Sequence, residues 1–367
     1  MWLKNKIFSR RLTGLDIGTS SLKAVEISSE LPPRFLAFKR VELPKGTIDS
    51  DGKIIEREAL RVSLKKLFAG ETFSSSDVVL GLNNFSAQTR KMTIPEKANA
   101  IQDPKVVQMA LSLTSLPLGD LLIDCEKLWS HKTKTGGESL RDILLVVAPK
   151  KRVSALKKSI NEVGLQSSVI DYQCLAVGNS FFFNYTIQAN EPDRSHLVVD
   201  CGAGSTKVIV VERGKTVFTS EIPMGGNDCS QMIQTELSIS FEAAEALKKN
   251  KKSEGKEKSA VHEFSNYLAG KIFELVNHPL HSQGRSPLGS VLITGGTSQL
   301  QGLKEILEAQ FRLPVNELNP LKQLVGTGEN MKLSLIREAS VYAAVALGLA
   351  LRSPGDKTKA EKRIVLK

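Results

Sequence analysis

Residues 16–27 read DIGTSSLKAVEI, and residues 200–211 read DCGAGSTKVIVV. The two stretches align without gaps, and each follows a short apolar run, Leu12–Leu15 or Leu197–Val199. An apolar run, a polar turn with glycine and a second run rich in β-branched residues predict a β-hairpin. Two such hairpins in the two halves of the chain predict a duplicated fold with two lobes and a cleft between them. Four aligned pairs are identical: Asp16 and Asp200, Gly18 and Gly202, Ser21 and Ser205, and Lys23 and Lys207.

The hairpin tips contain the groups that bind a phosphate chain. Backbone N–H groups approach phosphate closely at glycine, hydroxyls hydrogen-bond its oxygens, and Mg²⁺ prefers carboxylate and water ligands. Gly18 and Gly202 supply the glycines, and Asp16 and Asp200 are expected to hold a hydrated Mg²⁺. Lys23 either reaches a phosphate or, on an alternating strand, points to solvent. Four residues supply the hydroxyls: Thr19, Ser20, Ser205 and Thr206.

A third glycine turn lies in the last quarter of the chain. The sequence predicts a strand over Val291–Thr294, a sharp turn at Gly295-Gly296 and a helix over Gln299–Phe311. A helix N-terminus behind such a turn suits packing against a nucleotide. Many strand-to-helix turns contain a glycine pair, so this turn alone is a weak functional signal.

Composition limits the class of protein. The 367 residues suffice for two or three domains of about 150 residues each. The net charge of +11 is concentrated in residues 1–11, residues 248–258 and the tail from Pro354, so no basic groove for nucleic acid is expected. The four cysteines lack zinc or redox spacing and are expected to be reduced and buried. A signal sequence is absent, and Ala339–Leu351 is predicted as one buried helix too short to span a membrane, which favours a cytoplasmic protein.

Taken together, the motifs resemble a known superfamily. The order DIGTSSLK, DCGAGSTK and ITGG resembles the phosphate 1, phosphate 2 and adenosine motifs of the actin-like ATPases. Three further stretches narrow the resemblance to the FtsA-like PilM family of type IV pilus assembly proteins, from about Leu12 to Arg352: SLPLGDLLIDCEKL, VFTSEIPMGGNDCSQMI and ISFEAAEALK. The resemblance implies an α/β, two-lobed actin-like fold of the FtsA/Hsp70 type, with a duplicated ribonuclease H-like core and a nucleotide cleft between the lobes.

The resemblance also implies a division of the chain. The small subdomain of the second lobe is expected to be reduced, because the region after Lys248 is short and rich in lysine. The expected parts are a basic N-terminal segment (1–11), a first lobe (12–197) with a core subdomain (about 12–76 and 166–197) and an inserted subdomain (about 77–165), a second lobe (198–352) with a small subdomain (about 240–287), and a flexible basic tail (353–367).

The same resemblance implies ATP and Mg²⁺ as ligands. Glu245 and Lys248 stand three residues apart on one face of a helix predicted over Phe241–Asn250, which implies a place beside the ribose. An exposed helix ion pair is the other interpretation of these two residues. The remaining assigned positions are Asp16, Gly18, Thr19, Ser20 and Lys23 in phosphate 1, Asp200, Gly202, Gly204, Ser205 and Thr206 in phosphate 2, and Gly295 and Gly296 in the adenosine turn.

The function that the resemblance implies is that of a cytoplasmic, ATP-binding scaffold at the inner face of the bacterial inner membrane. Its expected partner is the cytoplasmic N-terminal peptide of the membrane protein PilN, gripped beside the inserted subdomain. Contact with PilO and the pilus motor ATPases would be indirect. An FtsA-like filament-forming protein, which would self-associate, and a small-molecule kinase of the same superfamily are the alternatives.

One segment departs from the superfamily. Residues 170–179, IDYQCLAVGN, lack the Glu-Pro that the chaperones have at this point. Asp171 and Gln173 are the polar groups that could orient an attacking water, and Asp171 is equally suited to cap the adjoining helix. No catalytic base is assigned, and any hydrolysis of ATP is expected to be slow.

Overall fold

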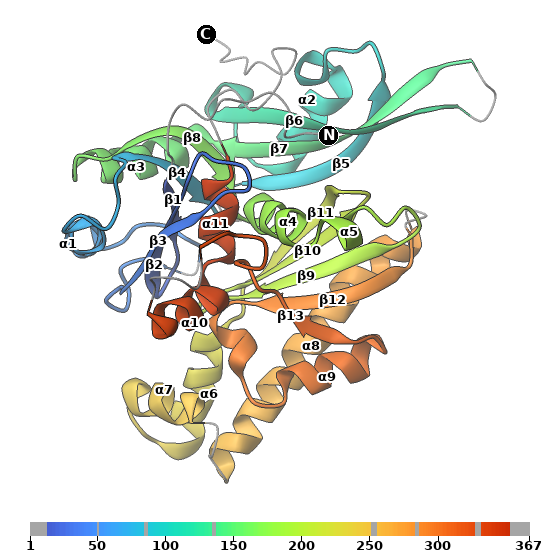
Figure 1. Ribbon diagram of the computed structural model, residues 1–367. Helices are drawn as coiled ribbons and strands as arrows, with labels where there is room; N and C mark the ends of the chain where they lie inside the picture. Colours follow the sequence, from blue (N-terminus) through green and yellow to red (C-terminus); the bar gives the residue numbers. More distant parts are fainter. Residues whose placement is uncertain are drawn as a thin grey trace.

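The computed structural model describes residues 13–49, 51–83, 87–133, 137–250, 255–282, 286–326 and 332–352. The basic N-terminal segment, the basic tail and residues 251–254 of the lysine-rich segment lie outside the described residues. Two five-stranded sheets and one three-stranded sheet form the framework, with helices packed between and around them (Figure 1).

The first hairpin lies in a five-stranded sheet with the order β3-β2-β1-β4-β8. β1, β2 and β3 are antiparallel neighbours, whereas β4 and β8 run parallel to β1. Apolar side chains cover both faces of the central strands, as expected for a sheet with helices on each side. The strands are β1 Thr13–Ile17, β2 Ser21–Ile27, β3 Phe35–Glu42, β4 Asp77–Leu82 and β8 Gln166–Tyr172.

The second hairpin lies in a sheet with the same topology. Its order is β11-β10-β9-β12-β13, in which β9, β10 and β11 are antiparallel neighbours and β12 and β13 run parallel to β9. The two hairpins and the duplication predicted from the sequence are therefore confirmed. The strands are β9 Ser195–Cys201, β10 Thr206–Glu212, β11 Lys215–Ile222, β12 Leu288–Thr294 and β13 Val315–Glu317.

The third sheet, with the order β5-β7-β6, is inserted into the first half of the chain. Val106 and Ala110 of α2 pack against Ile143 and Leu145 of β7. β4 lies in the range expected for this inserted subdomain, but it pairs with β1 and β8 in the first sheet, where all six of its residues are buried. The other domain boundaries stay a prediction. The elements are β5 Gln88–Pro95, a short turn at Ala100–Gln102, α2 Pro104–Leu113, a second turn at Leu118–Asp120, β6 Leu121–Lys132 and β7 Ser139–Pro149.

Helices cover the faces of the two large sheets. α1 and α3 pack on the first sheet, α4 lies between the second sheet and α11, and α6, α8 and α9 pack together on the second sheet (Figure 1). Ser240 accepts a hydrogen bond from Ala243 N at 3.1 Å and caps α7. The helices are α1 Arg57–Phe68, α3 Lys150–Asn161, α4 Gln173–Asn184, α5 Thr186–Ala189, α6 Gly226–Leu237, α7 Phe241–Lys249, α8 Lys256–Ser282, α9 Leu303–Phe311, α10 Leu333–Tyr342 and α11 Ala344–Ala350.

The apolar stretch Ala339–Leu351 is not the single helix that the sequence predicts. It belongs to α10 and α11, which are bent by 87° at Ala343. No proline or glycine stands at the bend, so the packing of α11 against β1 and α4 determines it. Among the described residues, no one helix is long and apolar enough to cross a membrane, and α10 and α11 reach that length only when counted as one bent pair.

The four cysteines are free and buried, as predicted. Burial raises the pKa of the Cys174 and Cys201 thiols and raises that of Cys229 to about 12. Because the thiolate is the reactive form, we expect DTNB to modify the native protein far more slowly than the urea-unfolded protein. The difference should be roughly a thousandfold, since modification waits for rare opening of the fold. One rapidly modified thiol in the native protein would contradict this burial.

Candidate functional site

The turn between β1 and β2 positions the first ion pair of the site. Gly18 N donates to Ser21 O at 3.1 Å and closes the turn. Asp16 and Lys23 are partners in the antiparallel register, and Lys23 Nζ lies 3.0 Å from Asp16 Oδ2. The Lys23 side chain is 15% exposed and the Asp16 side chain 7%. Lys23 is therefore held at Asp16 rather than pointing to solvent.

The turn between β9 and β10 repeats this geometry. Gly202 N donates to Ser205 O at 3.0 Å, and Lys207 is the register partner of Asp200. Lys207 Nζ lies 3.2 Å from Asp200 Oδ2. Lys207 is not among the site residues predicted from the sequence, although its alignment with Lys23 indicates an equivalent position.

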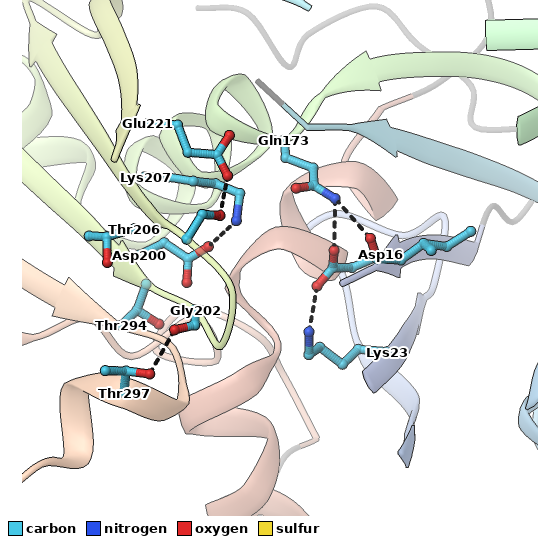
Figure 2. Close-up of polar contacts among 12 residues, drawn as sticks. Asp16, Lys23, Gln173, Asp200, Gly202, Thr206, Lys207, Glu221, Thr294 and Thr297 are labelled. Atoms are coloured by element: carbon cyan, nitrogen blue, oxygen red, sulfur yellow. Dashed lines mark hydrogen bonds and ion pairs between the residues drawn. The ribbon is translucent and has the colours of Figure 1, made fainter. Parts of the chain in front are cut away.

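The two ion pairs face one another at the boundary between the lobes (Figure 2). The turns themselves touch, because a Cβ atom on Gly204 would lie only 2.7 Å from Thr19 Oγ1. The repeat in the sequence thus brings two equivalent turns together from chain segments that are far apart.

Lys207 is the most enclosed cation of the site. Burial lowers the pKa of Lys207, but the negative charges of Asp200, Glu221 and Asp16 raise it more, so that its pKa lies above the usual value. Glu221, on β11, accepts a hydrogen bond from Ser205 Oγ. Sequence reasoning missed Glu221 because it stands on the third strand, outside the repeated motif.

Two predicted phosphate-binding hydroxyls donate to protein acceptors instead. Ser205 Oγ donates to Glu221, and Thr206 Oγ1 donates to Met224 O at 2.9 Å. Thr19 lies against Gly204, while Ser20 is exposed. Hydroxyl contacts to a phosphate chain therefore stay a prediction for Thr19 and Ser20, and the second turn would offer mainly its backbone.

Of the two candidate water-orienting groups, only Gln173 reaches the site. Its Nε2 donates to Asp16 Oδ1 at 3.0 Å and lies 3.5 Å from Ile17 O (Figure 2). Asp171 forms an ion pair with Arg352. No side chain caps α4, so the capping role predicted for Asp171 is wrong.

The glycine pair after β12 lies against the second turn. Gly295 has a φ of 85°, and a Cβ atom there would lie 2.4 Å from Cys201 O. Thr297 Oγ1 donates to Gly202 O at 2.7 Å. The predicted helix start at Gln299 is wrong, because Gly296–Gln299 forms a 3₁₀ turn and Gly302, with a φ of 84°, precedes the start of α9 at Leu303.

Glu245 and Lys248 lie next to these turns. Lys248 Nζ donates to Gly226 O at 2.7 Å and pairs with Glu245, which also accepts from Ser230 Oγ. Gly226 N in turn donates to Gly202 O at 3.0 Å. The pair is thus linked to the second turn and is not the exposed helix pair that was the other interpretation.

A pocket of about 640 Å³ lies beside Lys248, which is one of its lining residues. The end of α7, the first half of α8 and the segment after the 3₁₀ turn form its walls. The pocket was not foreseen from the sequence, because its walls come from three separate segments. The lining includes Leu247, Lys248, His262, Asn266, Gln299 and Gly302.

The two carboxylates that are predicted to hold a hydrated Mg²⁺ are paired with lysines. Asp16 and Asp200 are each bound by a lysine, at 3.0 Å and 3.2 Å. In the part of the chain that the structure describes, no group of three or more His, Cys, Asp or Glu residues could hold a metal ion. Direct coordination of a magnesium ion by these carboxylates would have to displace the lysines, and the predicted Mg²⁺ held through water stays a prediction.

The charge on Glu245 gives a testable dependence on pH. Burial raises the pKa of Glu245, but hydrogen bonds from Lys248 and Ser230 lower it more, so that it lies below 4.5. Its stabilising effect is therefore present above about pH 4.5 and is lost as the pH falls through the lowered pKa. We expect Glu245→Gln to reduce the free energy of unfolding by about 1 kcal/mol at pH 7, and by less at pH 3.5.

Urea unfolding at the two pH values measures this difference. Glu242→Gln, on the exposed face of the same helix, serves as the control and should change little at either pH. An equal loss for Glu245→Gln at both pH values would show that its charge is not responsible.

The overall geometry resembles that of solved structures. A chain in the PilM-PilN type IV pilus biogenesis complex superposes with a TM-score of 0.81 at 24% identity, over 95% of this chain and 99% of that chain. The ethanolamine utilization protein EutJ from Carboxydothermus hydrogenoformans superposes with a TM-score of 0.54 at 16% identity, over 95% and 92%. These similarities confirm the actin-like, two-lobed α/β fold.

Sequence comparisons point in the same direction. Cell division protein FtsA from Bacillus subtilis is 23% identical over 353 residues, covering 83% of this chain and 78% of FtsA. FtsA from Neisseria meningitidis is 29% identical over 188 residues, covering 44% of each chain. The sequence model of the family described as type IV pilus assembly protein PilM matches residues 14–354. Since that match spans almost the whole chain, the protein belongs to the PilM family of type IV pilus assembly proteins.

Proposed function

We propose that this chain is a nucleotide-binding scaffold of a type IV pilus assembly machine, which holds the cytoplasmic N-terminal peptide of a PilN-type membrane protein. The observation that carries the proposal is that two equivalent turns meet at the boundary between the lobes. A pocket lined in part by Lys248 lies beside them. Membership of the PilM family supports the pilus role.

ATP would lie across the lobe boundary. Its phosphates would contact the turns that contain Gly18 and Gly202, where backbone N–H groups are available to anions. Its ribose would lie near Glu245 and Lys248, and its base would enter the adjoining pocket. The hydrogen bonds that join Lys248, Gly226 and Gly202 support this order, because they connect the pocket to the second turn.

The inserted sheet is in contact with the second lobe, which supports a link between nucleotide and partner. Thr89 Oγ1 on β5 lies 2.6 Å from Thr219 Oγ1 on β11, and Lys215 pairs with Glu126 on β6 at 2.9 Å. Thr219 stands two residues before Glu221, which accepts from Ser205 in the second turn. β11 thus connects the proposed phosphate site with the sheet that is expected to lie beside the PilN peptide.

The cellular setting follows from the family and from the proposed partner. We infer a cytoplasmic protein that is recruited to the inner face of the inner membrane through PilN and is linked indirectly to PilO and the motor ATPases. A nucleic-acid partner is not expected, because the excess of basic residues is concentrated in three separate segments.

A filament-forming protein is the second candidate, favoured by the FtsA relative that matches 83% of this chain. The kinase alternative has less support. Asp171, a candidate carboxylate from the sequence analysis, is paired with Arg352 rather than facing the turns. Sedimentation of the purified chain with ATP distinguishes a filament, which pellets, from a scaffold, which stays in the supernatant.

Calorimetric titration tests the proposed function. The purified full chain is titrated with a synthetic peptide of the cytoplasmic N-terminal segment of PilN from the same genome, with and without ATP, and with a scrambled peptide as control. We expect saturable binding of the native peptide and a several-fold change of its Kd on addition of ATP. No binding in either condition, with folded protein, would refute the scaffold.

Two variants test the link through β11. Thr219→Val removes one partner of the hydrogen bond to Thr89, whereas Thr93→Val removes a hydrogen bond to Asp142 inside the inserted sheet. We expect Thr219→Val to reduce the effect of ATP on peptide affinity and Thr93→Val to preserve it.

A further inference from the structure

Asp200 is paired with a cation of its own protein. Its Oδ2 atom is bound by Lys207 Nζ at 3.2 Å, and both side chains are about 10% exposed or less. Its Oδ1 atom lies against the backbone of Gly295, since a Cβ atom there would be only 2.5 Å away. A hydrated metal ion at Asp200 would therefore have to compete with Lys207 for the carboxylate.

We propose that Lys207 is the fixed cation of the second turn, that it takes the place of a metal ion held by Asp200, and that nucleotide binding by this chain therefore depends little on Mg²⁺. This inference rests on the proposed nucleotide site. Lys207 would determine whether the nucleotide is bound with or without Mg²⁺. It would not perform a chemical step.

The charges around the two turns support the proposal. At a few ångströms, an opposite charge in a partly buried site interacts by several kcal/mol, so a carboxylate already paired with lysine attracts a second cation much less. Three carboxylates and two lysines meet at the site, and the charges of Asp200, Glu221 and Asp16 all act on Lys207, so removal of Lys207 raises the excess negative charge from one to two. The groups are Asp16, Asp200 and Glu221 as acids, and Lys23 and Lys207 as bases.

The first experiment compares the affinity for ATP in excess MgCl₂ and in excess EDTA. For the wild-type chain we expect the two Kd values to agree within about threefold. For Lys207→Met we expect affinity in EDTA to fall by roughly tenfold or more and to recover in MgCl₂, because the bare carboxylates then repel the phosphates. Lys91→Met is the matched control, since Lys91 pairs with Asp142 at 3.2 Å inside the inserted sheet, away from the turns, and it should behave like the wild type.

The second experiment does not involve nucleotide. Free Mn²⁺ is measured by electron paramagnetic resonance in the presence of each protein. We expect Lys207→Met to bind Mn²⁺, whereas the wild type, Lys207→Arg and the double variant Lys207→Met/Asp200→Asn do not. Lys207→Arg preserves the positive charge, so it separates the effect of the charge from that of the substitution, and Lys207→Gln, also uncharged and expected to bind Mn²⁺, replaces the methionine variant if that variant fails to fold.

The outcomes separate this inference from the proposed function. If the wild type binds no ATP in either buffer, the proposed nucleotide site is wrong, and the Mn²⁺ experiment still decides the role of Lys207. If the wild type binds ATP at least tenfold more tightly with Mg²⁺, or if folded Lys207→Met binds no more Mn²⁺ than the wild type, the role proposed for Lys207 is overturned.

Discussion

Gly348→Ala is expected to reduce the free energy of unfolding by about 3 kcal/mol, at the upper end of the usual cost of overpacking. A Cβ atom at Gly348 would lie 1.7 Å from Ala176 O, inside the backbone of α4. α11 cannot simply move away, because its carbonyl at Ala346 approaches Gly14 of β1 closely on another side. The added methyl group must therefore displace a helix that packs against both the first sheet and α4.

Gly270→Ala is the matched control for this substitution. Gly270 lies within α8, and a Cβ atom there would meet no other atom within 4 Å. Since alanine favours a helix over glycine, Gly270→Ala should increase stability by about 0.5–1 kcal/mol. The two variants thus shift the midpoint of urea unfolding in opposite directions, and a wild-type midpoint for Gly348→Ala would contradict the close packing of α11 on α4.

Gly204→Val is expected to weaken ATP binding by roughly 30-fold, or about 2 kcal/mol. Gly204 does not adopt the left-handed conformation, so valine is compatible with its backbone. Its side chain would project toward Thr19 and occupy the space between the two turns, where the phosphates are proposed to lie. The fold should persist, because the nearest obstacle is the tip of a small side chain.

Fluorescence titration with a labelled ATP analogue measures this loss. Gly119→Val is a suitable control, since a Cβ atom at Gly119 would meet nothing within 4 Å and the residue stands in the inserted subdomain. Wild-type affinity in Gly204→Val, with a native circular dichroism spectrum, would place the phosphates elsewhere.

The paired turns could be predicted from the sequence because their determinants are local. Each hairpin is specified by an apolar strand, a glycine turn and a β-branched strand within about a dozen residues. The register of such a hairpin then brings Asp16 opposite Lys23 and Asp200 opposite Lys207. The alignment of the two copies therefore indicates both ion pairs, although Lys23 was predicted as a site residue and Lys207 was not.

The features that were missed depend on contacts between distant segments. Glu221 reaches the second turn from β11, and the bend at Ala343 follows from the fit of α11 against β1 and α4. Likewise, β4 pairs with β1 although its sequence alone would suit any buried strand. A pattern along the chain specifies the type of an element but not the neighbour against which it packs.

Photolabelling with 8-azido-ATP, followed by mass spectrometry of the tryptic peptides, tests most directly whether nucleotide binds at the lobe boundary. The account predicts labelled peptides from the pocket walls, in residues 247–250, 255–266 or 299–302, and suppression of this labelling by excess ATP. Labelling confined to other segments, or labelling that excess ATP does not suppress, would contradict the proposed site.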